Sequence, residues 1–338
     1  MNENSSSHIS SIVEVCRCPT CTSPNCSKKE AHILCNQCGK KFPINAHSVD
    51  FLDFQKPVNE DEESQRIFQR ALENWGEDLH KDLELSFDYD KESGHHSSFY
   101  KFFAHKNKMN LGSVLDVGCG PGFDAQLNAK KNMNACFYGV DIGSNIPTIS
   151  VRDNDIPNLH YLRGDALNLP LKNQTMDSVV SMGVFHHTPN PKKCVEEAFR
   201  VLKPGGCLCV YLYKNHEENF LKYTGIKIEK ILLRLTSKLS VKTGKKLCYA
   251  LSPFVLLFFS WPAQLLKKIP QTKNIGSVFP LHWGTTPTSI IDDLQDRLMS
   301  PINHRFSKKN VEDLLINCGF SRVEVITAAP GHYAYGEK

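Results

Sequence analysis

The stretch VLDVGCGPGFDA, residues 114–125, decides the fold of this chain. It begins with a short aliphatic run and continues into a turn that contains Gly118, Gly120 and Gly122. Glycines let a turn run close to a ligand and let the next helix pack on the sheet. The segment therefore predicts a strand, a ligand-binding turn and a helix that begins near Phe123. The same G-x-G spacing occurs in dinucleotide-binding folds, so spacing alone does not identify the ligand.

Strand and helix patterns alternate after this segment. Apolar strands read SVLDVG, CFYGVDI and LHYLRGDA, and helical stretches separate them. Such alternation with short turns favours an α/β fold, with a mostly parallel sheet covered by helices on both faces. A ligand is then expected at the carboxyl ends of the strands.

Three acidic residues fall at expected strand ends, and they narrow the choice of ligand. Asp141 can accept hydrogen bonds from both hydroxyls of a ribose, and Asp165 can receive an adenine amino group. Asp116, close to the glycine turn, disfavours a pyrophosphate and suits a sulfonium or an ammonium group. The pattern indicates a nucleoside ligand that carries a positive charge and no phosphate.

These segments resemble class I S-adenosylmethionine-dependent methyltransferases over about residues 111–213. The matching stretches are VLDVGCGPG, VDI, GDALNLPLKNQTMDSVVSMGVFHHTPNP and RVLKPGGCLCVYLY, followed later by SKKNVEDLLINCGFSRVEVIT and HYAY. The resemblance implies a Rossmann-like seven-stranded sheet and S-adenosyl-L-methionine as cofactor. The positions it assigns to cofactor binding are Asp116, Gly118, Cys119, Gly120, Gly122, Asp141, Ile142, Asp165, Ala166, Met182 and Gly183. A dehydrogenase remains the competing interpretation, and it predicts binding of NADH instead of S-adenosylhomocysteine.

His186 and His187, in FHHTPNP, are the candidate catalytic residues. A neutral imidazole beside the transferred methyl can remove a proton from the acceptor as transfer proceeds. The alternative is that one histidine hydrogen-bonds the loop while the other lines the site without titrating.

Two C-x-x-C pairs near the N-terminus predict a metal site. Cys18, Cys21, Cys35 and Cys38 can occupy the corners of one tetrahedron, the closed geometry of structural zinc. Cys16 and Cys26 are further thiols that can replace a ligand, and a metal-free pair of turns is the alternative. Residues 15–54 also resemble small zinc modules that accompany some methyltransferases, which implies a scaffolding role.

The overall composition limits the class of protein and the cellular compartment that we expect. The chain has 338 residues, a net charge of +4 and thirteen cysteines. That charge does not by itself imply nucleic-acid binding, and the N-terminus lacks the pattern of a secretory signal. Scattered thiols favour a reducing, cytoplasmic location. We expect a zinc-ribbon-like module at 1–55, a linker with lead-in helices at 56–110, the cofactor core at 111–213, a helical insertion at 214–300 and core-completing elements at 301–338. His95 and His96 are expected in a loop of the lead-in segment, or else at the mouth of the active site.

The insertion combines basic and apolar residues. Its first helix is expected to be amphipathic, with Ile228, Ile231, Leu232, Leu235 and Leu239 opposite Lys227, Lys230, Arg234 and Lys238. Residues 247–266 carry no charge and have the length of a membrane span. Spanning is disfavoured because it would separate the final helix and strands from their sheet, and because Pro253 and Pro262 are expected to break the segment. From Lys214 to Lys273 there are twelve Lys and Arg against three Glu.

Two interpretations of the insertion stay open. It is either a helical cap with its apolar residues buried, or an apolar lid that docks on an anionic membrane and admits a lipid-like acceptor. Asp292, Asp293, Asp296, His304 and Arg305 are expected to form a polar wall of the acceptor site, or else a solvated helix face. A wobble-uridine-type tRNA methyltransferase and a non-catalytic cofactor-binding scaffold are the alternative functions.

Overall fold

A computed structural model describes residues 3–52, 111–236, 239–278, 286–300, 302–328 and 331–338. The predicted lead-in helices of segment 56–110, with His95 and His96, lie outside these residues.

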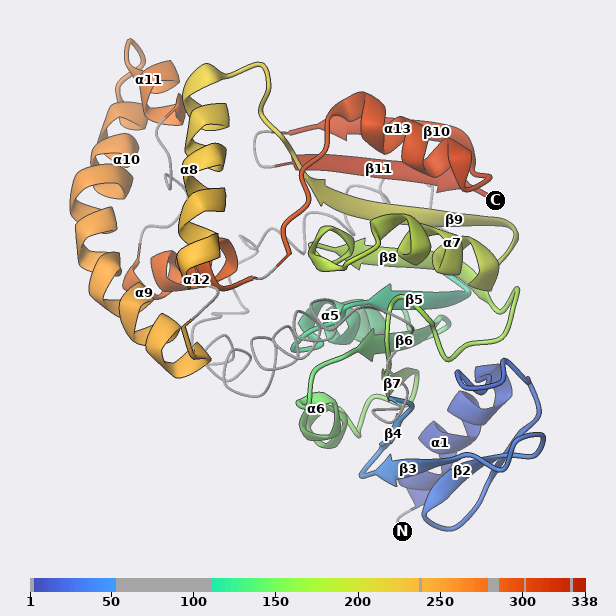
Figure 1. The fold of residues 1–338 in the computed structure, drawn as a ribbon. Coiled ribbons are helices and arrows are strands. Elements are labelled where there is room, and N and C mark those ends of the chain that lie inside the picture. The colour runs from blue at the N-terminus through green and yellow to red at the C-terminus, as the bar shows by residue number, and fades with distance from the viewer. Residues whose placement is uncertain (1–2, 53–110, 237–238, 279–285, 301, 329–330) are drawn as a thin grey trace.

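The core is one mixed sheet whose strand order, among the described residues, is β1-β2-β3-β4-β7-β6-β5-β8-β9-β11-β10 (Figure 1). Its last seven strands in this order are the Rossmann-like part, and the α/β prediction is confirmed. They are β7 (Leu159–Arg163), β6 (Cys136–Asp141), β5 (Ser113–Val117), β8 (Met176–Met182), β9 (Leu202–Tyr213), β11 (Gly331–Glu337) and β10 (Ser321–Thr327). The first five run parallel to their neighbours, and β11 pairs antiparallel with β9.

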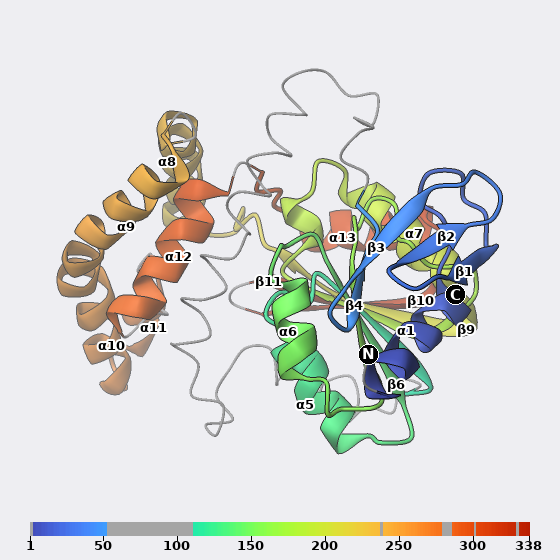
Figure 2. The same cartoon turned by 90° about the horizontal axis from the view of Figure 1, so that it is seen from below.

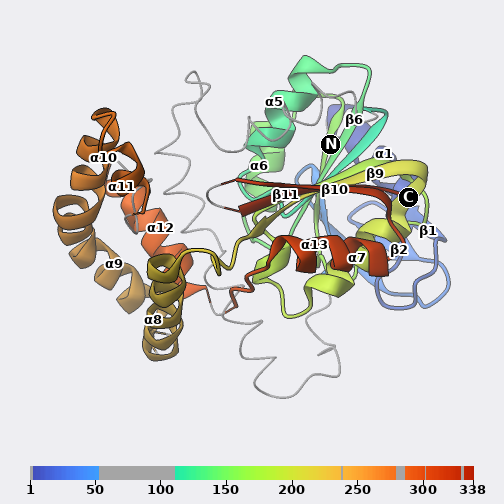
Figure 3. The ribbon, with the colours of Figure 1, turned by 90° about the horizontal axis from the view of Figure 1, so that it is seen from above.

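Helices cover both faces of this sheet (Figure 3). α5 (Phe123–Lys131) and α6 (Ile146–Arg152) lie on one face, and α7 (Pro191–Val201) and α13 (Lys308–Asn317) lie on the other. Local signals explain their ends. The Ser307 side chain accepts a hydrogen bond from the Asn310 amide at the start of α13, and Gly319 follows its end with a φ of 97°.

The N-terminal cysteine region continues the core sheet. After α1 (Glu3–Val15) come β1 (Cys26–Lys28), β2 (His32–Cys35), β3 (Lys41–Asn45) and β4 (Ser48–Asp50). β4 pairs parallel with β7, and Val49 lies opposite Leu162. Ile12, Phe42 and Leu162 belong to one buried cluster. The cysteine region therefore shares both the sheet and the hydrophobic core with the Rossmann-like part.

The insertion forms a separate group of helices beyond the end of the sheet toward which β8 and β9 point (Figure 1). It comprises α8 (Phe220–Thr236), α9 (Val241–Val255), the π-helical turn η2 (Leu256–Ser260), α10 (Trp261–Lys268), α11 (Lys273–Val278) and α12 (Pro287–Met299). These helices have a buried cluster of their own, formed by Cys248, Val255, Leu256, Ile290, Ile291, Leu294, Leu298 and Met299.

The chain leaves the core and returns to it at adjacent positions. Lys214 and Phe306 form a parallel bridge. The Asn215 amide donates to the Phe306 carbonyl at 2.9 Å, and the Phe306 amide donates to the Tyr213 carbonyl at 2.8 Å. The whole helical group is thus attached to the sheet at the carboxyl end of β9.

The prediction that prolines break residues 247–266 is wrong. Pro253 lies inside α9, and Pro262 lies in the first turn of α10, with the helical path continuous through η2. A proline lacks the amide that an α-helix needs and clashes with a carbonyl of the preceding turn. The π turn widens the helix there, and the Trp261 amide donates to the Leu256 carbonyl five residues earlier. The widened turn therefore accommodates Pro262, which follows it in the first turn of α10, and the helix does not end there.

Candidate active site

The glycine turn after β5 is held against neighbouring strands and loops. The Gly118 amide donates to the Val140 carbonyl at 2.7 Å. Gly118 has a φ of 78°, and a Cβ there would collide with the side chain of Val184. Gly122 has a φ of 77°, and a Cβ there would collide with the Tyr161 hydroxyl. Only glycine therefore permits this close approach of the turn to β6, β7 and the loop after β8.

Asp141, at the end of β6, connects the glycine turn to the loop that follows β6. Its Oδ2 accepts a hydrogen bond from the Gly120 amide at 2.9 Å, and its Oδ1 accepts one from the Gly143 amide at 2.7 Å. Each carboxylate oxygen has a second lone pair, so both oxygens keep acceptor capacity for a ribose hydroxyl. The carboxylate is half-buried and rigidly oriented, as a ribose-binding acid requires.

Asp116 and Asn145 are two buried polar residues next to the same turn, Asp116 just before it in the chain and Asn145 in a hydrogen bond with it. Asp116 is buried within β5, opposite Gly139 of β6 and Val180 of β8. Asn145, which the sequence analysis missed, donates from Nδ2 to the Gly120 carbonyl at 2.9 Å. Its Oδ1 is buried without a hydrogen-bond partner in the described part of the chain. An acceptor oxygen and a carboxylate beside a glycine turn suit a cationic amino-acid group.

The thiol of Cys119 lies inside the core. A Cβ added to Gly139 would come within 2.9 Å of its Sγ. Burial raises the pKa of the Cys119 thiol well above its ordinary value, and the Asp141 and Asp116 carboxylates raise it further. The neutral thiol fills space in the core, so only the backbone of Cys119 is available to a ligand.

The loop after β7 carries Asp165 and Ala166, the predicted adenine-binding positions. Asp165 Oδ1 accepts a hydrogen bond from the Leu167 amide at 2.8 Å, and Asp165 pairs with Asn168 in an isolated bridge. Gly164 donates its amide to the Asp141 carbonyl at 2.9 Å. The acids of the second and third strand ends therefore belong to directly connected loops.

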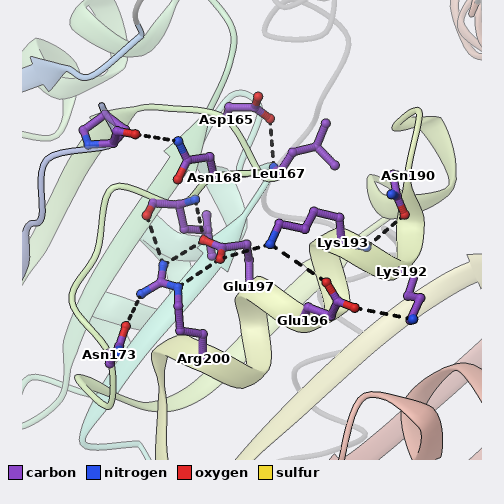
Figure 4. A network of polar contacts seen from close by, with 12 residues as sticks. Asp165, Leu167, Asn168, Asn173, Asn190, Lys192, Lys193, Glu196, Glu197 and Arg200 are labelled. Carbon is purple, nitrogen blue, oxygen red and sulfur yellow. Dashed lines mark hydrogen bonds and ion pairs between the residues drawn. The ribbon is translucent and has the colours of Figure 1, made fainter. Parts of the chain in front are cut away.

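A polar network holds this loop from below (Figure 4). Glu197 of α7 accepts hydrogen bonds from the Leu169 amide at 2.9 Å and from Arg200 at 2.8 Å. Asn168 Nδ2 donates to the Pro19 carbonyl at 2.9 Å. Pro19 lies between Cys18 and Cys21, so the loop after β7 contacts the predicted zinc knuckle directly. Sequence patterns carry no signal for this contact, because it joins residues far apart in the chain.

Met182 and Gly183 end β8 beside the glycine turn. Gly183 has a φ of 75°, and a Cβ there would meet nothing within 4 Å. Met182 pairs in register with Tyr211 of β9. The next residue, Val184, packs over Gly118 as described above. The structure thus brings the predicted positions of the first motif and of the β8 end together at one edge of the sheet.

His186 and His187 form a short 3-10 turn and have different surroundings. His186 is fully buried, and its ring lies 3.8 Å from the Tyr213 ring, centroid to centroid. His187 Nδ1 lies 2.8 Å from the Ile302 carbonyl. A carbonyl only accepts, so Nδ1 carries the proton and Nε2 of the neutral ring carries the lone pair. This geometry leaves Nε2 of His187 as an acceptor, while the His186 ring is packed against Tyr213.

Three tyrosines that the sequence analysis did not select lie in this region: the rings of Tyr211 and Tyr213 lie 6.4 Å and 3.8 Å from the His186 ring, and Tyr333 lies beside Tyr211. Tyr211 and Tyr213 lie at the end of β9, two residues apart and therefore on one face of the strand. The rings of Tyr211 and Tyr333 lie 5.0 Å apart, and those of Tyr211 and Tyr213 lie 5.9 Å apart. The signal was present in YLY and HYAY, but only the pairing of β9 with β11 shows that the tyrosines meet.

The predicted polar wall is resolved into separate interactions. Asp293 forms an ion pair with Arg297 at 2.9 Å within α12. Arg305 lies 2.6 Å from Glu229 of α8 and stacks over the Tyr213 ring at 5.5 Å. The His304 amide donates to the His186 carbonyl at 2.8 Å, and burial lowers the pKa of the His304 ring. His304 and Arg305 therefore adjoin the histidine and tyrosine rings, while Asp293 stabilises the insertion. The side chains of Asp292 and Asp296 lie outside the described residues.

The four predicted zinc ligands converge. Sγ atoms of Cys18, Cys21, Cys35 and Cys38 all lie within 4.8 Å of one another. Cys18 and Cys38 are 3.7 Å apart, and Cys21 and Cys35 are 3.5 Å apart. A tetrahedral Zn²⁺ with Zn–S bonds of about 2.3 Å requires sulfurs about 3.8 Å apart, so the thiols fit this ion. Cys16 and Cys26 lie outside this group and hydrogen-bond to each other.

The structure is thus a Rossmann-like α/β fold with a cluster of four cysteines attached to its sheet. Comparison with known proteins shows that residues 115–210 match the model of the methyltransferase domain. This match favours the methyltransferase interpretation over the dehydrogenase interpretation.

Several curated proteins match this part of the chain. It is 29% identical over 139 residues to a phthiotriol/phenolphthiotriol dimycocerosates methyltransferase 1 of Mycobacterium ulcerans, covering 41% of this chain and 51% of that protein. It is 34% identical over 93 residues to a fatty-acid O-methyltransferase of Mycolicibacterium smegmatis, covering 28% and 34%. It is 31% identical over 109 residues to a probable tRNA methyltransferase 9B of Mus musculus, covering 31% and 23%.

The chain spans about half the length of the first of these relatives. Among solved structures, a SAM dependent methyltransferase from Aquifex aeolicus aligns with a TM-score of 0.42 at 18% identity, covering 77% of this chain and 98% of that one.

Proposed function

We propose that the protein transfers the methyl group of S-adenosyl-L-methionine to a hydrophobic, lipid-like acceptor. The observation that carries this proposal is the group of His186, Tyr211, Tyr213 and Tyr333 rings at the carboxyl ends of the strands. This group adjoins the predicted cofactor positions through Met182, and it adjoins the helical insertion through Lys214. An apolar acceptor that enters from the insertion would meet these rings before it reached the methyl donor.

We propose the following cofactor positions. Asp141 and Ile142 would hold the ribose and one side of the adenine, and Asp165 and Ala166 would hold the adenine edge. Gly118, Cys119 and Gly120 would offer their backbone to the methionine part. Asp116 and Asn145 would receive its ammonium group, and Met182 and Gly183 would border the reacting end.

The sulfonium donor supplies an electrophilic methyl group when bound, so the protein mainly has to align the acceptor and exclude water. His187 Nε2 would take the proton that an acceptor hydroxyl or amine loses as its new bond to carbon forms. The hydrogen bond from Nδ1 to the Ile302 carbonyl orients the ring for this role. The tyrosine rings would hold an apolar chain by contact with their faces.

Two relatives support a lipid-like acceptor, since their names specify a phthiotriol dimycocerosate and a fatty acid. A third, named as a probable tRNA methyltransferase, supports RNA as the second candidate. The apolar residues exposed on this chain's insertion favour the lipid, because RNA binding relies on phosphate contacts and base stacking.

The test is transfer of an isotopically labelled methyl group from the donor to total lipid and total RNA extracts, followed by mass spectrometry. The proposal predicts a labelled product in the organic phase that forms at least about a hundredfold more slowly with His187→Gln. If the label appeared only in RNA, the acceptor would be a nucleic acid and not a lipid. Absence of label from both extracts, with intact cofactor binding, would point to a non-catalytic scaffold.

A further inference from the structure

Exposed large apolar side chains gather on the helical insertion. Seventeen such residues are exposed in the described part of the chain, and fourteen of them lie between Phe220 and Ile275. Elsewhere they are isolated, namely Met133, Val151 and Ile316. Scattered apolar residues on a surface are ordinary, whereas a contiguous group marks a binding surface. The expectation that the apolar residues of this insertion are buried is therefore met by only some of them.

The exposed residues form a stripe along the longest helical segment. Phe254, Leu257, Phe258, Trp261 and Leu265 recur at spacings of three and four residues, and each is more than half exposed, from 51% to 63%. Spacings of three and four place side chains on one face of a helix. We call these five residues the apolar stripe.

The opposite face of the same segment is buried against its neighbours. Cys248, Val255 and Leu256 pack with Ile290, Ile291 and Leu294 of α12 in the insertion's own cluster. α12 lies between α9–α10 and the sheet, so the apolar stripe is carried by the outer helix (Figures 2 and 3). The segment is thus two-faced, with one face packed on protein and the other facing outward.

Positive charge brackets the apolar stripe. Lys242 and Lys246 are exposed before it, and Lys268 is exposed after it. On α8, Lys227, Lys230 and Arg234 are exposed among Ile228, Ile231, Leu232 and Leu235. A helical surface that alternates bulky apolar and basic residues is complementary to the boundary of headgroups and acyl chains in an anionic bilayer.

Length and composition also allow the 27 residues Lys242–Lys268 to cross a membrane, and only 28% of their most apolar 18-residue window is buried. The surroundings favour an in-plane position. α12 packs alongside α9, and Arg297 of α12 forms ion pairs with Glu229 at 3.0 Å and with Asp293 at 2.9 Å. A membrane-spanning position would place these charged side chains in the hydrocarbon layer, or it would separate α12 from the helices against which it packs.

We propose that the apolar stripe inserts shallowly into the surface of an anionic bilayer, with Lys242, Lys246 and Lys268 at the headgroups. In the cytoplasm this surface would be the inner face of a membrane. The proposal deepens the proposed function, because it rests on a lipid-like acceptor that such a membrane holds. It also gives the acceptor a route to the His186 and tyrosine rings that avoids water.

The test is flotation of the full-length protein with vesicles of phosphatidylcholine alone and with added phosphatidylglycerol. We expect binding to the mixed vesicles, weakened by salt. A Phe258→Glu, Trp261→Glu and Leu265→Glu triple variant should lower the bound fraction by about tenfold or more. Ile316→Glu is the matched control, because Ile316 is 56% exposed on α13 and should leave binding unchanged.

A second readout follows the stripe itself. Trp261 is 54% exposed, so its insertion should shift its fluorescence to shorter wavelength and permit quenching by brominated lipids. Trp261→Phe should abolish that change while S-adenosylhomocysteine binding stays intact.

Several results would overturn the docking proposal. The first two are that the protein does not bind vesicles, or that Ile316→Glu loses as much binding as the triple variant. Resistance to extraction by alkaline carbonate would indicate a spanning helix, and a dimer in solution that the triple variant dissociates would indicate that the stripe binds a second copy of the chain. The proposed function is tested apart from this by methyl transfer to a detergent-dispersed lipid. That reaction should survive the triple variant, so failure of docking and failure of lipid methylation are distinguishable.

Discussion

Arg17 and Glu197 form a buried ion pair in which Nη2 of the arginine lies 3.0 Å from Oε2 of the glutamate. Arg17 directly precedes Cys18 of the candidate zinc site, and Glu197 belongs to α7. The same guanidinium donates to Asn168 Oδ1 at 3.1 Å and to the Leu169 carbonyl at 3.2 Å. The cysteine site and the helix α7 thus clamp the loop that carries Asp165 from two sides.

This clamp predicts that Asn168 positions the adenine side of the cofactor. Asn168→Ala removes its hydrogen bonds to Pro19 and Arg17, at about 1 kcal/mol for each hydrogen bond. We expect S-adenosylhomocysteine affinity, measured by calorimetry, to fall by about tenfold while the fold is retained. Asn173→Ala is the matched control, because Asn173 contacts Arg200 at 2.8 Å on the exposed side of the network. Equal affinities in Asn168→Ala and the natural chain would show that the loop does not depend on the clamp.

Metal removal should have a similar effect through the same contacts. Zn²⁺ would hold Cys18 and Cys21 in place and, with them, the Pro19 carbonyl that receives Asn168. Chelation or Cys38→Ser should lower both the melting temperature and the S-adenosylhomocysteine affinity, with loss of about one zinc per chain by elemental analysis. Cys318→Ser, outside the cluster, should change neither. A metal-free protein with unaltered affinity would separate the zinc site from the cofactor site.

Asp141 is predicted to contribute charge as well as geometry to cofactor binding. Asp141→Asn keeps the size of the side chain but weakens its bonds to the Gly120 and Gly143 amides and to a ribose. Hydrogen bonds to a charged group contribute about 1.5–3 kcal/mol, so affinity for S-adenosylhomocysteine should fall by at least about tenfold. Asp155→Asn, an exposed substitution after α6, serves as the control. Calorimetry on the two variants decides the role of the carboxylate.

Substitutions of the two adjacent histidines should have different effects on turnover and on stability. His187→Gln should lower kcat by about a hundredfold or more and leave cofactor affinity unchanged, since general-base help is worth that much. His186→Gln should instead lower the melting temperature, because His186 is buried against Tyr213. Single-turnover rates and thermal unfolding distinguish these effects. If both variants keep full turnover, neither histidine is the base.

Acid should loosen the contact between α1 and β7. His160 Nδ1 lies 3.1 Å from His8 Nδ1. Burial and the neighbouring His8 lower the pKa of His160 from 6.5 to about 3. The unfolded chain therefore binds a proton that the folded chain does not, between these two pH values. Stability is full above pH 6.5 and falls below it by at most about 1.4 kcal/mol per pH unit.

The corresponding experiment compares melting temperatures from pH 7.5 to pH 5. The natural chain should lose stability steeply below pH 6.5, and His160→Gln should show a shallower slope. Parallel slopes for the two proteins would contradict a neutral, buried His160.

Much of the fold was readable because its signals are local. The aliphatic runs and glycines of residues 114–125 specify a strand and a turn, and Ser307 and Gly319 mark the ends of one helix. The four cysteines were also readable, since each C-x-x-C pair is a short motif. By contrast, the pairing of β4 with β7 joins residues more than a hundred positions apart, and no local pattern reports it.

The candidate site divides in the same way. Asp141 and His187 were found from motifs, whereas Asn145, Asn168 and the meeting of Tyr211 with Tyr333 depend on tertiary pairing. The error at Pro253 and Pro262 has a related cause. Proline usually ends a helix, but a π turn between the two prolines keeps the helical path continuous.

The central claim is that the edge formed by Asp116, Asp141 and Asp165 binds an adenosyl sulfur compound. Calorimetric titration of the purified protein with S-adenosylhomocysteine, with NADH as the competing ligand, tests it most directly. The account predicts one saturable site for S-adenosylhomocysteine, weakened in Asp141→Asn, and no heat from NADH. Saturable binding of NADH with none of S-adenosylhomocysteine would contradict it.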